Sequence, residues 1–363
     1  MYTILLVIGI LVVLIVAHEL GHFIAAKMFG VRVQEFGVGY PPRAFLFAKF
    51  GGTEYTLNWL PLGGFVRLFG DEGEAERGPG SFVDASKPVQ AIILVAGVLA
   101  NAILAWALFA GALSYGIPRV VDAPIPNGQT QLVVADVVLG SPAEAGGLTA
   151  GDEILSVEDS KGLSPTTLSP EQISAFVQER GGQQVSFTYA RAGATSTTTI
   201  RPAHAVIAEQ AGRPAVGVAL VLVNSGGMPW RDAMYESLFR TRDAFISVGT
   251  GLWGILREAL SGHPNLSGIV GPVGLVNVVS DAASHGIGNV LALAGFISVN
   301  LVIINLIPFP VLDGGRLLLL AVETMRRRSA PRITVQLLNI LGVVLIALLM
   351  ITVTYNDIAR LFS

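Results

Sequence analysis

The sequence predicts a polytopic α-helical membrane protein. It has four transmembrane helices, a membrane-associated β hairpin on the cytoplasmic side and a folded domain inserted on the extracytoplasmic side. The first observation is composition, because 52% of the 363 residues are hydrophobic and only 13% are charged, whereas soluble proteins carry about 25% charged residues. The second is a set of four apolar stretches, each near the ~20 residues that a spanning helix needs. The third is residues 116–224, where alternating strands and Pro/Gly turns replace the apolar runs.

Composition also limits the chemistry that the chain can perform. The formal net charge is only −3, so charge gives no sign of a nucleic-acid partner. The chain has no cysteine, which excludes disulfides, thiolate metal sites and thiol catalysis. Any bound zinc must therefore be held by histidine, aspartate or glutamate.

The first predicted span, residues 1–30, contains the polar motif His18-Glu19-x-x-His22. Residues four apart share one face of a helix, so both histidines can bind one metal ion. Glu19 can then act as a base on a metal-bound water. Ionisable groups inside a membrane cost about 2.5–3.5 kcal/mol each, which favours a metal site over the alternative, a polar helix end near the headgroups.

The flanks of this span indicate its orientation. Met1-Tyr2-Thr3 contains no basic residue, and no small-residue cleavage site lies between the start of the apolar run and His18. We therefore expect a retained first helix and not a cleaved signal peptide. Lys27 and Arg32 follow the run. The positive-inside rule then puts the N-terminus outside and the chain from residue 30 onward in the cytoplasm.

Residues 31–70 read as β structure, because residues 31–36 and 54–59 alternate between apolar and polar side chains with glycines and prolines between them. Two interpretations stay open for this region. It is either a plain connecting hairpin or a membrane-associated hairpin that offers a strand edge to an extended peptide.

Residues 71–88 are polar and predict a loop, and residues 89–115 form the second predicted span. The small residues Ala96, Gly97 and Ala100 allow close helix contact in this span. Asn101 is its one strongly polar residue, and we expect it to hydrogen-bond to a neighbouring helix.

The inserted domain, residues 116–224, resembles a PDZ domain. The resemblance lies in Ser141-Pro142-Ala143, followed by Gly147-Leu148-x-x-Gly151-Asp152-x-Ile154-Leu155. Residues 170–180 would form the PDZ helix, and residues 184–189 and 197–201 its closing strands. PDZ domains bind peptides by strand addition. A domain that only limits access, without binding a peptide, remains the alternative.

Residues 225–288 connect this domain to the third span. Apolar residues at helical spacing over residues 231–260 predict one or two amphipathic helices, either on the outer membrane surface or packed against the spans. Leu266-Ser267-Gly268 and Gly271-Pro272-Val273-Gly274 would form a glycine-rich link into the membrane.

The third span, residues 289–322, is interrupted by Asn305-x-x-Pro308-x-Pro310-x-Leu312-Asp313-Gly314-Gly315. Broken backbone at membrane depth usually lines a site. Asp313 is a natural third ligand, because two histidines and one carboxylate leave a fourth position for water on zinc. An ion pair with Arg316 or a helix cap is the alternative role.

Residues 323–333 contain a cluster of arginines and predict a cytoplasmic loop, and residues 334–355 form the fourth span. Both termini are then extracytoplasmic. The same assignment puts His18, His22 and Asp313 at similar depth in the cytoplasmic half of the membrane.

The two motifs at opposite ends of the chain, with a PDZ insert between them, resemble the site-2 protease family of intramembrane zinc metalloproteases. The closest resemblance is to the bacterial regulator-of-sigma-E protease type with one PDZ domain. Supporting stretches are Phe36-Gly37-Val38-Gly39, Leu60-Pro61-Leu62-Gly63-Gly64-Phe65-Val66, Ser86-Lys87-Pro88, Leu266-Ser267-Gly268 and Gly271-Pro272-Val273-Gly274.

The resemblance implies a role for each matching residue. Zn²⁺ would be held by His18, His22 and Asp313, with Glu19 as the catalytic base. Asn305, together with Pro308 and Pro310, would bind substrate. The β region at residues 31–70 would present a strand edge to the unwound substrate.

The resemblance also implies a place and a substrate class. The protein would lie in the bacterial cytoplasmic (inner) membrane and act in regulated intramembrane proteolysis. Its substrates would be single-span membrane proteins already cut by an upstream site-1-type protease, such as anti-sigma-factor-like proteins or signal-peptide remnants. Two residues depart from the family pattern. Val98 stands where many relatives have proline, and Arg316 where many have histidine.

A second function from another class is a membrane-anchored PDZ adaptor without catalysis. It accounts for the inserted domain but leaves the four polar residues His18, Glu19, His22 and Asp313 without a role. A transporter is disfavoured because the chain shows no repeated halves.

Overall fold

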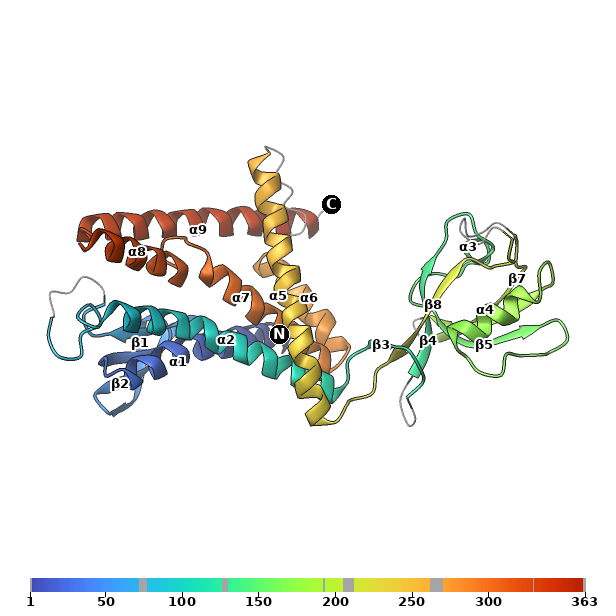
Figure 1. Ribbon diagram of the computed structural model, residues 1–363, viewed down its shortest axis with the longest axis horizontal. Coiled ribbons are helices and arrows are strands. Elements are labelled where there is room, and N and C mark those ends of the chain that lie inside the picture. The colour runs from blue at the N-terminus through green and yellow to red at the C-terminus, as the bar shows by residue number, and fades with distance from the viewer. Residues whose placement is uncertain are drawn as a thin grey trace. The chain divides into compact units, whose positions relative to one another are not determined.

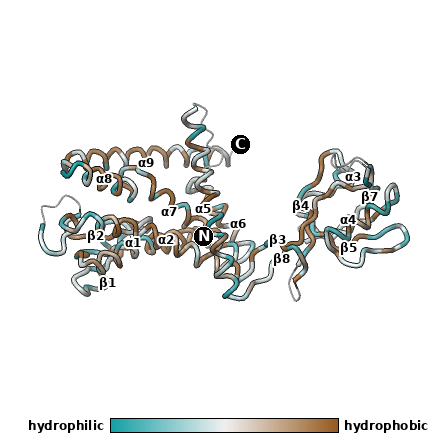
Figure 2. The backbone as a smooth tube through the Cα atoms, in the orientation of Figure 1, coloured by the Kyte–Doolittle hydropathy of each residue, from teal (hydrophilic) through white to brown (hydrophobic). Residues whose placement is uncertain are grey.

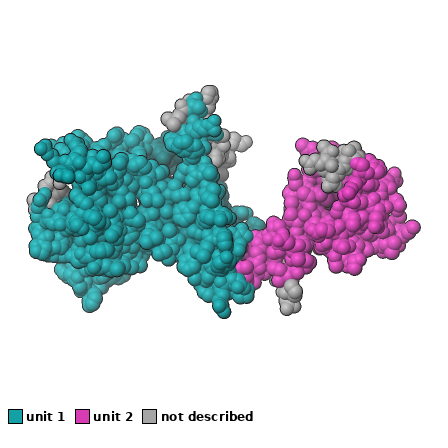
Figure 3. All heavy atoms as spheres, in the orientation of Figure 1, with its two compact units in different colours: residues 1–114, 229–363 teal, residues 115–228 magenta. Residues whose placement is uncertain are grey.

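The computed structural model describes residues 2–71, 77–125, 130–191, 193–204, 212–261, 270–328 and 330–361. The chain forms two compact units (Figure 3). We call Met1–Ser114 with Pro229–Ser363 the membrane unit and Tyr115–Met228 the PDZ-like unit. The expected link Leu266-Ser267-Gly268 lies outside the described residues, as do residues 72–76 of the expected loop.

Four helices in the described part of the chain are long and apolar enough to cross a membrane. They are α1 (Tyr2–Met28), α2 (Lys87–Tyr115), α7 (Ile287–Leu306) and α9 (Arg332–Leu361). Figure 2 shows hydrophobic residues running along α2, α7 and α9. The expected multi-pass fold with four membrane helices is confirmed.

Three further helices complete the membrane unit as described: α5 (Trp230–Leu260), α6 (Pro272–Ser284) and α8 (Asp313–Arg326). The expected link at residues 271–274 is wrong, because Gly271 caps α6 and Pro272 begins it. Residues 231–260 thus lie in one helix, which Figure 1 shows running across the spans. Val248 of α5 belongs to an apolar cluster with Ala105 of α2 and Val299 of α7. The Trp106 Nε1–H donates to the Met234 carbonyl at 3.0 Å. Of the two placements left open for this segment, these contacts match packing against the spans.

The β region consists of two long strands, β1 (Val33–Phe50) and β2 (Thr53–Leu68). Both strands bend, so that residues 35–38 have partners on two sides, at 54–57 and at 64–67. Residues 43–50 pair with 53–58 in turn. The region is therefore a small folded sheet whose last segment, residues 64–68, has β1 as its described strand partner.

The PDZ-like unit is a six-stranded sheet in the order β3-β8-β4-β5-β6-β7. Its elements are β3 (Arg119–Val121), β4 (Thr130–Val137), α3 (Pro142–Ala145), β5 (Glu153–Asp159), α4 (Pro170–Gln178), β6 (Val185–Arg191), β7 (Ala194–Ile200) and β8 (Val218–Asn224). Phe187, Val157 and Ile173 lie in its buried core. The helix and the closing strands expected from the PDZ resemblance appear here as α4, β6 and β7.

Candidate metal centre

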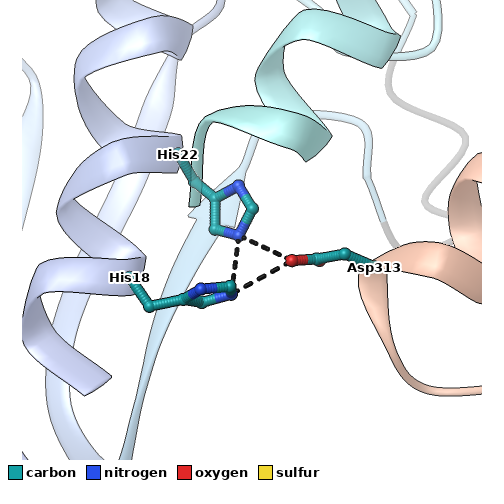
Figure 4. A group of neighbouring side chains, drawn as sticks. All are labelled: His18, His22 and Asp313. Carbon is teal, nitrogen blue, oxygen red and sulfur yellow. Dashed lines mark hydrogen bonds and ion pairs between the residues drawn. The ribbon is translucent and has the colours of Figure 1, made fainter. Parts of the chain in front are cut away.

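Three side chains from distant parts of the membrane unit point toward one another (Figure 4). His18 and His22 come from α1, and Asp313 is the first residue of α8. The two Nε2 atoms lie 3.2 Å apart. Asp313 Oδ2 lies 3.0 Å from His18 Nε2 and 3.3 Å from His22 Nε2. The structure thus assembles the three ligand candidates named by the sequence.

The separations of these ligand atoms fit a zinc site. Bonds of 2.0–2.1 Å in a tetrahedron put ligand atoms about 3.3 Å apart. The Nδ1–H of His22 donates to the Ile93 carbonyl at 2.8 Å. We assign the neutral ring with its Nε2 lone pair facing Asp313, because a metal-ligating histidine commonly uses its other nitrogen in this way. Two imidazole lone pairs and a carboxylate that converge in this way call for a cation between them.

Close helix packing aims the histidines at this point. A side chain at Gly97 of α2 would collide with the His22 ring, and one at Gly21 of α1 would collide with the Ala96 backbone of α2. The two glycines therefore let α1 and α2 approach closely. His22 and His18, one helical turn apart, then share the face that looks away from lipid.

Asp313 is positioned by a strained turn between α7 and α8. Val311 has a φ of +81°, which is unfavourable for a β-branched residue. A side chain at Gly314 would meet the carbonyls of Leu306 and Ile307, and one at Gly315 would meet the Phe309 carbonyl. The glycines thus let the turn fold tightly over the start of α8, where the helix dipole favours a carboxylate.

Arg316 takes a different partner from the one considered above. Its Nη2 donates to Asp71 Oδ1 at 2.9 Å, which ties α8 to the segment that follows β2. The N-cap position of α8 is occupied by Leu312, which has no side-chain cap. The Asp313 carboxylate is left facing the two histidines.

Glu19 lies beside this cluster, half-buried, and interacts electrostatically with all three of its members. Its carboxylate is within hydrogen-bonding reach of the Val66 backbone of β2. A side chain at Gly64 would come within 3.3 Å of the Glu19 Cγ. The β region therefore packs directly on the face of α1 that carries Glu19.

The three expected substrate-binding residues lie at the break between α7 and α8. Asn305 is half-buried near the end of α7, Pro308 is exposed and Pro310 is half-buried in the turn. In the described part of the chain, no hydrogen bond or ion pair joins Asn305 to His18, His22 or Asp313. Their role in substrate binding stays a prediction.

Sequence reasoning missed two groups that organise the site. One is the Ile93 carbonyl, which no side-chain pattern reveals because every residue has one. The other is Asp71, whose pairing with Arg316 joins residues 245 apart. For Gly97 the signal was present, since it lies in the run of small residues in α2.

Comparisons with known proteins agree with this site. The model of peptidase family M50 matches residues 6–349. A Clostridium perfringens protein provisionally named a zinc metalloprotease is 31% identical over 95% of both chains. The zinc metalloprotease RasP of Shouchella clausii is 28% identical over the full length of both.

A solved PDZ domain of an SdrC-like protein from Listeria monocytogenes matches with a TM-score of 0.21 and 19% identity, covering 27% of this chain and 92% of that one. The family match and the full-length relatives confirm the resemblance found in the sequence. The chain is a multi-pass zinc metalloprotease that belongs to peptidase family M50.

Proposed function

We propose that this metalloprotease hydrolyses peptide bonds within the transmembrane segments of single-span membrane proteins. One observation carries the proposal. The ligand cluster is built on α1, a helix apolar and long enough to span the membrane, and on the turn that follows α7, another such helix. An active site at that depth is in reach of a peptide bond that lies in the bilayer.

His18, His22 and Asp313 would hold Zn²⁺. When bound, zinc lowers the pKa of water toward about 7 and polarises the scissile carbonyl. Glu19 is the group in the site free to move protons: its carboxylate accepts a proton from water and returns it to the leaving amine. The contact with β2 at Gly64 and Val66 limits the orientations of this carboxylate.

The β region supplies a means of holding an unwound substrate. A helical substrate hides its amides in its own hydrogen bonds, so a segment has to unwind before it is cut. Residues 64–68 pair with β1 along one side, and their Gly64 and Val66 lie against Glu19. An extended peptide that adds to this segment finds substitute backbone bonds beside the catalytic base.

We infer that the substrates are fragments already trimmed by an upstream site-1-type protease, such as anti-sigma-factor-like proteins or signal-peptide remnants. The charge pattern supports a bacterial inner-membrane orientation with the PDZ-like unit and both termini outside. Lys27 lies in the last turn of α1, which also carries the metal-ligand histidines, and Arg326 ends α8, which begins at Asp313 and is followed by Arg327 and Arg328. These basic residues indicate a cytoplasmic side near the metal centre. The PDZ-like unit would exclude untrimmed proteins or bind the new ends of trimmed ones.

The variant Glu19→Gln tests the proposal. It keeps the side-chain shape but cannot accept a proton, so we expect full zinc content with loss of cleavage. Trimmed single-span fragments should accumulate in cells and co-purify with the variant, where mass spectrometry identifies them. Fragment turnover at the wild-type rate would contradict the proposal and would favour the adaptor function.

A further inference from the structure

The two histidines of the metal centre are supported unequally. His22 Nδ1 bonds to the Ile93 carbonyl at 2.8 Å. His18 Nδ1 is buried, and no group among the described residues hydrogen-bonds to it. Histidines that bind metals almost always use the second nitrogen in a hydrogen bond, which fixes the tautomer and the ring orientation. His18 therefore needs a partner that the described contacts do not supply directly.

Asn101 of α2 also has a buried side chain without hydrogen-bond partners among the described residues, and its amide oxygen can accept what a histidine N–H donates. Its side chain is fully buried, and within the described chain neither Oδ1 nor Nδ2 has a hydrogen-bond partner. Burying an amide without hydrogen-bond partners destabilises a fold, because the group loses its bonds to water and gains none in return. Such groups are commonly joined by a buried water. The expectation that Asn101 bonds to a neighbouring helix is met only by its backbone, whose carbonyl accepts from Ser298 Oγ at 2.8 Å.

The packing of α1 against α2 places His18 and Asn101 at the same height along the two helices. Ala25 and Ala26, near the end of α1, share a core cluster with Ile93 and Leu94, near the start of α2, so the helices run antiparallel. The His22 ring lies over Gly97. One turn back along α1 is His18, and one turn forward along α2 is Asn101.

The face of α2 agrees with this placement. Asn101 follows Gly97 by four residues, so both project toward the same side of the helix. Ser298 Oγ of α7 donates to the backbone carbonyl of Asn101, so α7 packs against α2 at this residue. This contact is at the level of His18.

We propose that Asn101 is a positioning residue that acts through His18: the His18 Nδ1–H donates to a bridging water, and that water donates to the side-chain oxygen of Asn101. The amide then does for His18 what the Ile93 carbonyl does for His22. It holds the proton on Nδ1 and aims the Nε2 lone pair at the ligand cluster. The inference rests on the metal centre described above, and it adds a residue of a second helix to that centre.

The test is zinc affinity, measured by chelator competition on the purified full-length protein in detergent. Asn101→Leu keeps the side-chain shape without polar atoms, and its zinc dissociation constant should rise about 10- to 100-fold. Asn101→Gln keeps an amide oxygen without adding a charge and should retain more zinc affinity than Asn101→Leu. Asn300→Leu is the matched control, because the hydrogen bond that the Asn300 amide makes among the described residues stays within α7, to the Phe296 carbonyl at 2.9 Å.

Two further measurements separate positioning from a general loss of structure. In a His18→Ala chain, Asn101→Leu should cause no further loss of zinc affinity, since the ring through which it acts is gone. The absorption spectrum of the cobalt-loaded protein should shift in Asn101→Leu and not in Asn300→Leu. If Asn101→Leu fails to fold, Asn101→Ala takes its place.

The zinc affinities of the variants and of the wild-type protein separate an error about Asn101 from an error about the metal centre. Wild-type zinc affinity in Asn101→Leu, or an equal loss in the His18→Ala background, would overturn the role of Asn101 while the centre stands. A wild-type protein that binds no zinc would overturn the centre and the inference together.

Discussion

At the scale of single residues, His22 shows how one imidazole is fixed by groups that carry no side-chain chemistry of their own. The Ile93 carbonyl accepts from its Nδ1, and Gly97 lies directly under its ring. The ring has little room to rotate as a result. A metal ligand inside a membrane is thus oriented by backbone, which does not add a further charge to an apolar setting.

Gly97→Ala should disturb this arrangement. The added methyl would collide with His22 Nε2, so the ring or α2 must move. We expect zinc affinity to fall by about 10-fold or more, as for other losses of ligand support. Chelator competition measures it. Gly9→Ala on α1 is the control, because nothing lies within 4 Å of a Cβ there; equal effects of the two substitutions would contradict the prediction.

The metal ligands were predictable because the spacing of the polar residues and the apolar sequence around them both indicate a metal site. His18 and His22 are four apart in an apolar run, and Asp313 lies in a break of another apolar run. The partners of neighbouring groups were not predictable. Arg316 lies three residues from Asp313, yet its guanidinium donates to Asp71. The fold brings α8 next to the segment that follows β2, and a sequence pattern does not reveal that contact.

At the scale of elements, the turn between α7 and α8 and the last segment of β2 meet at α1. The turn is held from outside as well, since a side chain at Gly342 of α9 would collide with Pro310 and Val311. The strained φ of Val311 is thus maintained by packing from another span. A turn with two prolines and a strand segment that begins with Gly64 thus bring Asp313 and the strand edge to the histidines.

Gly64→Val should impair cleavage without removing the metal. The new side chain would enter the space of Ile15 and Glu19, which lie 3.2 and 3.3 Å from a Cβ at this position. A shift of ~1 Å between base and substrate can cost about 100-fold in rate, so we expect a loss approaching that size.

The measurement is the cleavage rate of a trimmed single-span substrate, with zinc content determined in parallel. Ala48→Val adds bulk to the exposed outer segment of β1 and should leave both unchanged. Loss of zinc in Gly64→Val, or an unimpaired rate, would count against a role for this strand edge.

The four spanning helices followed from length and hydropathy, but α6 and the path of the β region did not. Alternation in residues 31–36 and 54–59 identifies strands, yet it does not say that residues 35–38 acquire partners on both sides. That outcome depends on bends within both strands, where glycine and proline allow several geometries. Likewise, the amphipathic pattern of residues 231–260 fits a membrane surface equally well as packing against spans.

At the scale of the whole molecule, the chain is two units with separate cores. The buried cluster that contains Phe187, Ile173 and Val157 lies entirely within the PDZ-like unit. This unit also has its own ion pair, between the buried Asp152 and the half-exposed Arg191. Asp152 accepts from Arg191 Nε at 2.6 Å and Nη2 at 2.8 Å, and from the Thr149 backbone N–H at 2.8 Å.

The stability of the PDZ-like unit should depend on acid through this pair. The Arg191 guanidinium, with the Thr149 backbone N–H, holds the pKa of Asp152 below its ordinary value. The stabilisation is therefore complete above the unfolded pKa of about 3.9 and is lost as pH falls through the lower folded value. The melting temperature of the excised PDZ-like unit should stay constant from about pH 7 to 5 and should fall as the pH drops below about 4.

Asp152→Asn is the matched variant for this measurement. It removes the charge while keeping the shape, so its melting temperature should be lower at pH 7, by a free energy of about 1–3 kcal/mol, and less sensitive to acid. The same acid dependence in wild type and variant would show that other groups control the transition.

The separation into units also predicts what the PDZ-like unit contributes to proteolysis. The chain leaves the membrane unit after Ser114 and returns at Pro229, and the metal centre, Glu19 and the strand edge all belong to the membrane unit. A chain in which a flexible Gly-Ser linker replaces residues 117–226 should therefore keep zinc affinity and cleave trimmed single-span substrates at a near wild-type rate.

If the PDZ-like unit acts by excluding large substrates, this chain should also cleave untrimmed substrates that the intact protein rejects. Paired assays of one substrate with and without its extracytoplasmic domain measure the difference. If the unit instead recruits trimmed ends, the deletion should raise KM for trimmed substrates and give no cleavage of untrimmed ones. Loss of zinc binding on deletion would contradict the independence of the metal centre from the inserted unit, which both alternatives require.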